Sequence, residues 1–215
     1  MFEQARNYLQ FEKGRYEVIG GFLSPVHDAY GKSSLIAQHH RQSMCEAAVA
    51  SSSWLSVQSW EMRQRGWTTT AETLCKYQSA LNRAHLTDSD SPIRVKMLCG
   101  ADLIESTLVP GLWAMEDLEL IFGTFGVVVI ERVGLDLVPL IAASPHLAKY
   151  AANIDIVPQR ITNTISSTSV RKLIATQQSV RFLTPDPVID YIKEHRLYGH
   201  DPDKHPPNEY LEPKL

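Results

Sequence analysis

Three segments of the sequence combine residue types that bind phosphate groups. Residues 24–32 (SPVHDAYGK) place Lys32 beside a glycine on a loop, where its ammonium would lie next to a phosphate. Residues 99–102 (CGAD) and 163–171 (NTISSTSVR) add a glycine, hydroxyl groups and a further cation. These residue types predict an anionic ligand. For the first segment, a solvated turn with an exposed lysine is the simpler alternative.

The segment 163–171 is typical of a phosphate site at the start of a helix. Ser166 or Ser167 is suited to be the N-cap, so the first backbone N–H groups and the positive end of the helix dipole would face a ligand. Arg171 would lie within the first turn. The hydroxyl residues beside Arg171 favour phosphate over the alternative, an ordinary capped helix without a ligand.

The segment 99–102 is expected to approach a ligand at the end of a strand. Gly100 would let the backbone pass close to it, and Asp102 would either cap the following helix or bind a ligand hydroxyl. Further along, Trp113 would either stack on an aromatic ligand or belong to the core.

Other site motifs are missing from the sequence. It contains no G-x-G-x-x-G fingerprint, no P-loop and no G-x-S-x-G nucleophile elbow. His39 and His40 are adjacent and would point apart, and no Cys/His spacing fits a structural zinc site. Three cysteines, an odd number, do not build a disulfide framework and favour a reducing compartment.

Length and composition are those of a globular domain. The chain has 215 residues, 44% of them hydrophobic and 21% charged, which suffices for a substantial core. The net charge of −3 does not favour a nucleic-acid scaffold. No apolar run is long enough to span a membrane as a helix.

The elements that must position these residues alternate between strands and helices. Apolar runs predict strands at 16–23, 54–57, 94–98, 126–130 and 153–157. Helices are expected at 1–11, 35–50, 70–83, 166–177 and 186–195. This alternation predicts an α/β fold, with a mainly parallel sheet covered by helices on both faces and ligands at the carboxyl ends of its strands. Residues 1–198 would form one domain, with a turn-rich linker at 87–92, and 199–215 a disordered tail.

Six segments in order resemble the eukaryotic nicotinamide mononucleotide adenylyltransferases. They are SPVHDAYGK (24–32), WTTT (67–70), LCGADLIES (98–106), PGLW (110–113), NTISSTSVRKL (163–173) and SVRFLTPDPVIDYI (179–192). The resemblance extends from Met1 to about Tyr198 and implies a Rossmann-like nucleotidyltransferase fold. It implies transfer of AMP from ATP to nicotinamide or nicotinic acid mononucleotide, assisted by Mg²⁺, which yields NAD and pyrophosphate. Cytoplasm, nucleus and mitochondrion all suit this family. A homo-oligomer is compatible with the sequence, which does not fix the oligomeric state.

The resemblance assigns roles to individual residues. Lys32 and Arg171 match charges that act on the transferred phosphates. The implied pyridine-nucleotide pocket comprises Trp67, Thr70, Leu112, Trp113 and Asn163. The implied ATP site comprises Lys32, Gly100, Asp102, Thr168, Ser169, Val170 and Arg171. A second lysine usually follows the first in this family, and Ser33 stands there instead.

The start of the sequence departs from the family pattern. The family opens with a strand and a Gly-Ser/Cys-Phe-x-Pro-x-Thr-x-x-His turn that holds the ATP phosphates, and this element would end just before Met1. We therefore expect a sheet without its first strand, and weak or no activity of the 215-residue chain. Two alternatives are a non-catalytic nucleotide-binding or chaperone-like short form, and transfer to another phosphate acceptor. Trp67 and Trp113 favour an acceptor with a flat aromatic ring.

Overall fold

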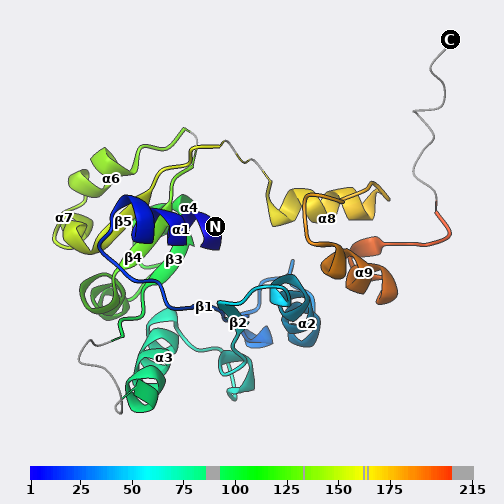
Figure 1. The fold of residues 1–215 in the computed structure, drawn as a ribbon, viewed down its shortest axis with the longest axis horizontal. Helices are drawn as coiled ribbons and strands as arrows, with labels where there is room; N and C mark the ends of the chain where they lie inside the picture. Colours follow the sequence, from blue (N-terminus) through cyan, green and yellow to red (C-terminus); the bar gives the residue numbers. More distant parts are fainter. Residues whose placement is uncertain (86–92, 133, 162, 164, 205–215) are drawn as a thin grey trace, which may run out of the picture. The chain divides into compact units, whose positions relative to one another are not determined.

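The computed structural model describes residues 1–85, 93–132, 134–161, 163 and 165–204. They group into two compact units (Figure 1). The sheet unit comprises Met1–Ile19 and Trp67–Thr162, and the helical unit comprises Gly20–Gly66 and Asn163–Leu215. The predicted linker at 87–92 and residues 205–215 of the predicted tail lie outside the described residues. The single domain over 1–198 stays a prediction.

The sheet unit is built on three parallel strands. These are β3 (Met97–Gly100), β4 (Val127–Ile130) and β5 (Ile154–Val157), in the spatial order β3-β4-β5. Leu98 pairs with Val128, which pairs with Asp155. All four residues of β4 are buried, as expected of a central strand in a parallel sheet.

Helices cover both faces of this sheet, as predicted. Side chains alternate along a strand, so Val127 and Val129 face one side. The helices on that side are α3 (Thr70–His85), α4 (Ala101–Thr107), α5 (Met115–Leu118) with the π-helix Glu119–Phe125, α6 (Leu137–Ala143) and α7 (Pro145–Ala148). Val128 and Ile130 face the other side, against α1 (Phe2–Asn7) and the π-helix Tyr8–Glu12 that continues it.

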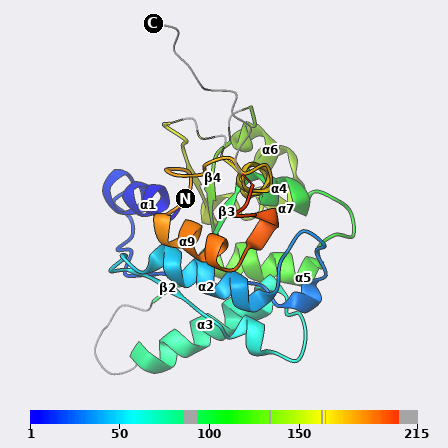
Figure 2. The same ribbon diagram turned by 90° about the vertical axis from the view of Figure 1, so that its right-hand side faces the viewer.

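The helical unit contains a separate pair of parallel strands. In it β1 (Gly21–Leu23) pairs with β2 (Leu55–Val57). Helix α9 (Asp186–Glu194) lies beside α2 (Gln38–Val49) (Figure 1, Figure 2). With α8 (Ser167–Ala175) they enclose a second apolar core, which includes Ile174, Val188 and Ile192. Short 3-10 helices lie at Asp28–Tyr30, Glu61–Arg63 and Leu197–Gly199, and one at Ala151–Asn153 in the sheet unit. No helix among the described residues is long and apolar enough to cross a membrane.

Two predicted strands were misplaced. The strand expected at 16–23 is only Gly21–Leu23, because Trp54 O and β2 supply hydrogen-bond partners only from Gly21 onwards. The strand expected at 94–98 is β3, Met97–Gly100. Before β3, Gln78 Nε2 donates to Ile93 O at 2.7 Å and Gln78 Oε1 accepts the Val95 N–H at 2.8 Å. These side-chain bonds take the place of the backbone hydrogen bonds that a strand would make with a neighbouring strand. The other predicted strands and helices are present with ends shifted by a few residues.

Candidate nucleotide-binding site

The amino end of α8 is capped as the sequence predicts. Ser166 is the N-cap, and its Oγ accepts the backbone N–H of Ser169 at 3.1 Å. The two serine hydroxyls also lie 2.8 Å apart. Thr168 and Ser169 are exposed in the first turn and Val170 is half-buried, so this end of the helix presents hydroxyls and N–H groups to solvent. Such an end is suited to bind an anion.

Arg171 connects this helix end to residues 28–37, which carry Lys32 and are called the lysine loop below. Its Nη1 donates to Ser34 O at 3.0 Å, and its Nη2 lies 3.5 Å from Thr168 Oγ1. Its guanidinium also lies 6.0 Å from the centre of the Tyr198 ring. Lys32, two residues before Ser34, is exposed. The structure therefore brings together two segments that the sequence predicted independently as phosphate ligands.

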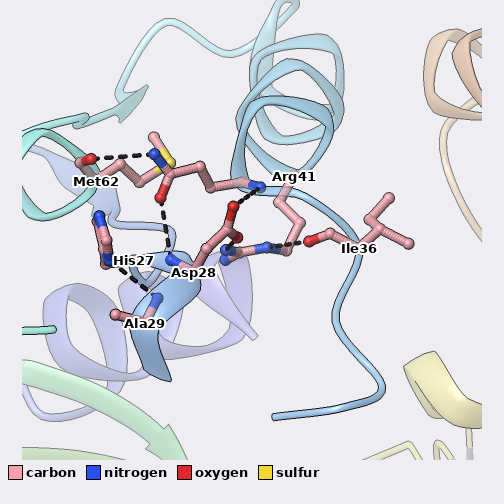
Figure 3. A network of polar contacts seen from close by, with 7 residues as sticks. His27, Asp28, Ala29, Ile36, Arg41 and Met62 are labelled. Atoms are coloured by element: carbon pink, nitrogen blue, oxygen red, sulfur yellow. Dashed lines mark hydrogen bonds and ion pairs between the residues drawn. The ribbon is translucent and has the colours of Figure 1, made fainter. Parts of the chain in front are cut away.

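The lysine loop begins with a 3-10 turn whose residues bond one another (Figure 3). His27 Nδ1 accepts the Ala29 N–H at 3.0 Å and caps the turn Asp28–Tyr30. Gly31 ends the turn with a φ of 72°, a left-handed conformation that favours glycine. Lys32 follows this residue, so its backbone starts from a fixed turn.

Asp28 reaches across the loop to the first turn of α2 (Figure 3). Its Oδ2 accepts the Gln38 N–H at 3.1 Å, its Oδ1 pairs with Arg41 Nη2 at 2.8 Å, and its own N–H donates to Gln38 Oε1 at 3.0 Å. Burial acts to raise the pKa of Asp28, but the Gln38 N–H and Arg41 outweigh it and the pKa is lowered. Asp28 thus caps α2 from ten positions away, which no local N-cap pattern could reveal.

Arg41 closes the other end of the loop. Its Nε donates to Ile36 O at 2.9 Å, and the residue is buried, with 9% of its surface exposed. Gln38 adds a further connection, since its Nε2 donates to Met62 O at 3.2 Å. The helix expected from residue 35 begins at Gln38 because residues 28–37 are held by these contacts instead.

A second carboxyl group lies beside this network. Glu61 is buried, and its Oε2 accepts the Ser24 hydroxyl at 2.9 Å. Burial raises the pKa of Glu61, and the hydrogen bond from Ser24 and the charge of Arg41 offset this only in part. The sequence alone assigned no role to Glu61 or to Arg41.

In the sheet unit, Gly100 and Asp102 lie where β3 passes into α4. Gly100 is the N-cap of α4 with extended backbone, and a Cβ placed on it would meet no atom within 4 Å. Neither strain nor packing in the sheet unit therefore requires glycine there, and its role beside a ligand stays a prediction. The alternative that Asp102 caps α4 is wrong. Its carboxylate pairs with Arg132, which follows β4, and both side chains are exposed.

Trp113 is fixed near the other end of α4. Its Nε1 donates to Ser106 Oγ at 3.1 Å, while its ring is half-buried against the core. Leu112 beside it is exposed. Helix α4 has seven residues and is about 10 Å long, with Gly100 at its amino end and Ser106, the partner of Trp113, in its last turn. Trp113 is thus partly a core residue and also borders solvent, and its stacking role stays a prediction.

Trp67 and Thr70 lie at the start of α3. Thr69 Oγ1 accepts the Glu72 N–H at 3.2 Å, and Glu72 Oε2 accepts the Thr69 N–H at 2.8 Å. This reciprocal capping box fixes the first helical residue, Thr70, and the chain that carries the exposed Trp67. The T-x-x-E pattern at 69–72 was a sequence signal for this boundary.

The remaining predicted residue, Asn163, precedes α8 in the helical unit. Its Oδ1 accepts the Ile165 N–H at 2.9 Å, which shapes the approach to the helix. The predicted residues thus divide into two sets. The helical unit holds Lys32, Asn163, Thr168, Ser169, Val170 and Arg171, and the sheet unit holds Trp67, Thr70, Gly100, Asp102, Leu112 and Trp113.

Comparison with known proteins identifies the family. A family described as Cytidylyltransferase-like matches residues 1–173. The bovine nicotinamide/nicotinic acid mononucleotide adenylyltransferase 1 is 38% identical over 93% of this chain and 82% of its own length. The nicotinamide/nicotinic acid mononucleotide adenylyltransferase of Oryza sativa subsp. japonica is 42% identical over 92% of this chain and 78% of its own. The chain belongs to this adenylyltransferase family.

Family members differ in how much of their length the chain spans. It covers 57% of the Drosophila melanogaster nicotinamide-nucleotide adenylyltransferase, which is 38% identical. Membership confirms the resemblance and the Rossmann-like α/β class predicted from the sequence. It also makes the chain a nucleotidyltransferase by family.

Proposed function

We propose that the chain transfers the AMP moiety of ATP to nicotinamide mononucleotide or nicotinic acid mononucleotide. An oxygen of the mononucleotide 5′-phosphate attacks the α-phosphorus of ATP. The bond from that phosphorus to the oxygen bridging to the β-phosphate breaks, and pyrophosphate leaves with the electron pair. Such a reaction depends on alignment and charge neutralisation more than on covalent help from the protein.

The observation that carries this proposal is the hydrogen bond from Arg171 to Ser34. It holds two cations, Lys32 and Arg171, on segments that meet at the amino end of α8. In the proposed reaction both cations neutralise the pyrophosphate, while Thr168 and Ser169 supply hydroxyl donors. Val170, whose N–H donates to Ser166 O at 3.0 Å, would line the site beside them. Gly100 and Asp102 would hold the adenosine ribose, since this strand end is open beside Gly100.

The pyridine nucleotide would contact a second group of residues. Trp113 and Leu112 would form one wall for the ring, and Trp67 and Thr70 would enclose it. Asn163 would hydrogen-bond the nucleotide. The half-buried ring of Trp113, held by Ser106, supports this role because its orientation is fixed before a ligand binds.

Mg²⁺ would enter this reaction as part of the substrate, MgATP. The described residues form no group of three or more His, Cys, Asp or Glu suited to hold a metal ion. The candidate phosphate ligands are hydroxyls, N–H groups and cations, which complement phosphate oxygens. Mg²⁺ commonly binds through substrate phosphates and water, where it neutralises charge on the leaving group.

A direct assay tests the proposal. The full chain is incubated with ATP, nicotinamide mononucleotide and Mg²⁺, and NAD and pyrophosphate are quantified together. Equal amounts of both, lost without either substrate, would support the transfer. The sequence predicts weak or no activity of the 215-residue chain, so its rate is compared with that of the bovine relative under the same conditions. Tight mononucleotide binding by calorimetry without product would instead support the non-catalytic alternative, and full activity with a non-pyridine acceptor would contradict the choice of substrate.

A further inference from the structure

We propose that Asp28 and Arg41 are positioning residues that hold Lys32 for the ATP phosphates. This inference rests on the proposed function. Lys32 lies on a loop that leaves a 3-10 turn at Gly31 and enters α2 at Gln38. A lysine on a free loop would lose much conformational freedom on binding ATP, whereas a lysine on a loop closed in advance loses less.

Asp28 fixes the start of the loop. Its carboxylate and its backbone N–H make three contacts, with the Gln38 N–H, Arg41 Nη2 and Gln38 Oε1 (Figure 3). The residues before and after the loop are therefore joined to each other. The two ends of the segment that carries Lys32 cannot separate without breaking these bonds.

Arg41 fixes the end of the loop by using two sides of one planar group. Its Nε bonds Ile36 O and its Nη2 bonds Asp28 Oδ1, at 2.9 and 2.8 Å. The side chain is nine-tenths buried, so this guanidinium serves the loop and not solvent. A lysine at this position would keep the charge but lacks the fork that reaches both acceptors.

Arg171 adds a third point of attachment inside the loop. It bonds Ser34 O, two residues after Lys32, and so connects the loop to the amino end of α8. Lys32 itself lies between the attachments at Asp28 and Ser34 and is exposed. The loop is thus held on either side of a cation that points to solvent at the candidate phosphate site.

Steady-state kinetics of two conservative variants test the proposal. Asp28→Asn removes the charge but keeps the size, and Arg41→Lys removes the fork. We expect each to raise the KM for ATP about tenfold, an effect usual for members of one hydrogen-bonded network. The KM for the mononucleotide should stay within about twofold in the same series. Equal increases for both substrates would overturn the proposal, because a merely structural role would affect both.

A double variant tests whether the contacts of Asp28 and Arg41, called the clamp below, act through Lys32. If they do, Asp28→Asn combined with Lys32→Ala raises the KM for ATP no further than Lys32→Ala alone. Independent, multiplying losses would overturn the proposal. Asp201→Asn is the matched control, because Asp201 also accepts a backbone N–H and pairs with a cation, Lys204, within the same unit. It should leave both KM values unchanged.

Limited proteolysis separates this proposal from the proposed function. Trypsin cleaves after lysine, and cleavage after Lys32 reports opening of the loop without any turnover. Asp28→Asn and Arg41→Lys should accelerate this cleavage several-fold, with other tryptic sites and the Asp201→Asn control unaffected. If the unaltered chain forms no NAD, the proposed function fails while this measurement still tests the clamp. Unchanged cleavage after Lys32 overturns it.

Discussion

Arg171 and Ser34 are 137 positions apart, and Arg171 Nη1 donates a hydrogen bond to the Ser34 carbonyl at 3.0 Å. This bond joins the amino end of α8 to the loop of Lys32. We predict that Arg171→Ala raises the KM for ATP about 10- to 100-fold, because it removes a cation and releases the loop. The KM for nicotinamide mononucleotide should rise much less. Steady-state kinetics with each substrate varied in turn provide the measurement.

The control for Arg171 is another arginine of the helical unit. Arg181 is exposed and forms an ion pair with Asp186, so Arg181→Ala removes the same charge from a pair that does not include the lysine loop. This variant should keep both KM values. Equal weakening of ATP and mononucleotide binding by Arg171→Ala would show that the start of α8 is not the triphosphate site.

Trp113 is predicted to bind the pyridine ring. Trp113→Ala should raise the KM for nicotinamide mononucleotide up to about tenfold and leave that for ATP nearly constant, because ring stacking is lost. Trp113→Phe keeps an aromatic face but loses the hydrogen bond to Ser106, so it should show a smaller increase. Wild-type mononucleotide affinity in Trp113→Ala, measured by calorimetry, would exclude the stacking role.

Local sequence signals predicted most elements but not the contacts between distant segments. The valine run of β4 and the serine cap of α8 are short-range patterns, and both are present. The cap of α2 is Asp28, ten positions away, and only the folded loop brings it to Gln38. The role of Arg41 depends on the same loop, so residue type and spacing could not reveal it.

The buried charge of Asp155 is predicted to be structurally essential to the sheet unit. Asp155 lies on β5, is 1% exposed, and pairs with Lys96 at 2.9 Å and with Lys13 at 3.2 Å. Asp155→Asn would leave Lys96 nearly buried without its counter-charge, at a cost of about 3–5 kcal/mol in the free energy of unfolding. Chemical denaturation measures this directly.

The matched control removes an exposed ion pair of the same unit. Glu12→Gln breaks the pair with Arg160, whose side chains are 40% and 69% exposed respectively. It should cost far less than Asp155→Asn, since solvent screens such pairs. If Asp155→Asn and Glu12→Gln lower the free energy of unfolding by similar amounts, burial does not determine how much these charges contribute to stability.

Glu61 is predicted to make stability fall as pH rises. Burial raises the pKa of this carboxyl above its ordinary value of 4.5, so between 4.5 and the folded-state pKa the folded chain holds more protons than the unfolded chain. The stabilisation from the protonated form is complete below this window and is lost as pH rises through it. Glu61→Gln keeps an acceptor for Ser24 and removes the ionisation, so it should stabilise the chain at pH 7 and remove this pH dependence. Chemical denaturation of wild type and Glu61→Gln from pH 4 to pH 8 measures the difference in the free energy of unfolding. If the variant is less stable than wild type at pH 7, the Glu61 carboxylate is net stabilising beside Arg41 and the prediction is wrong.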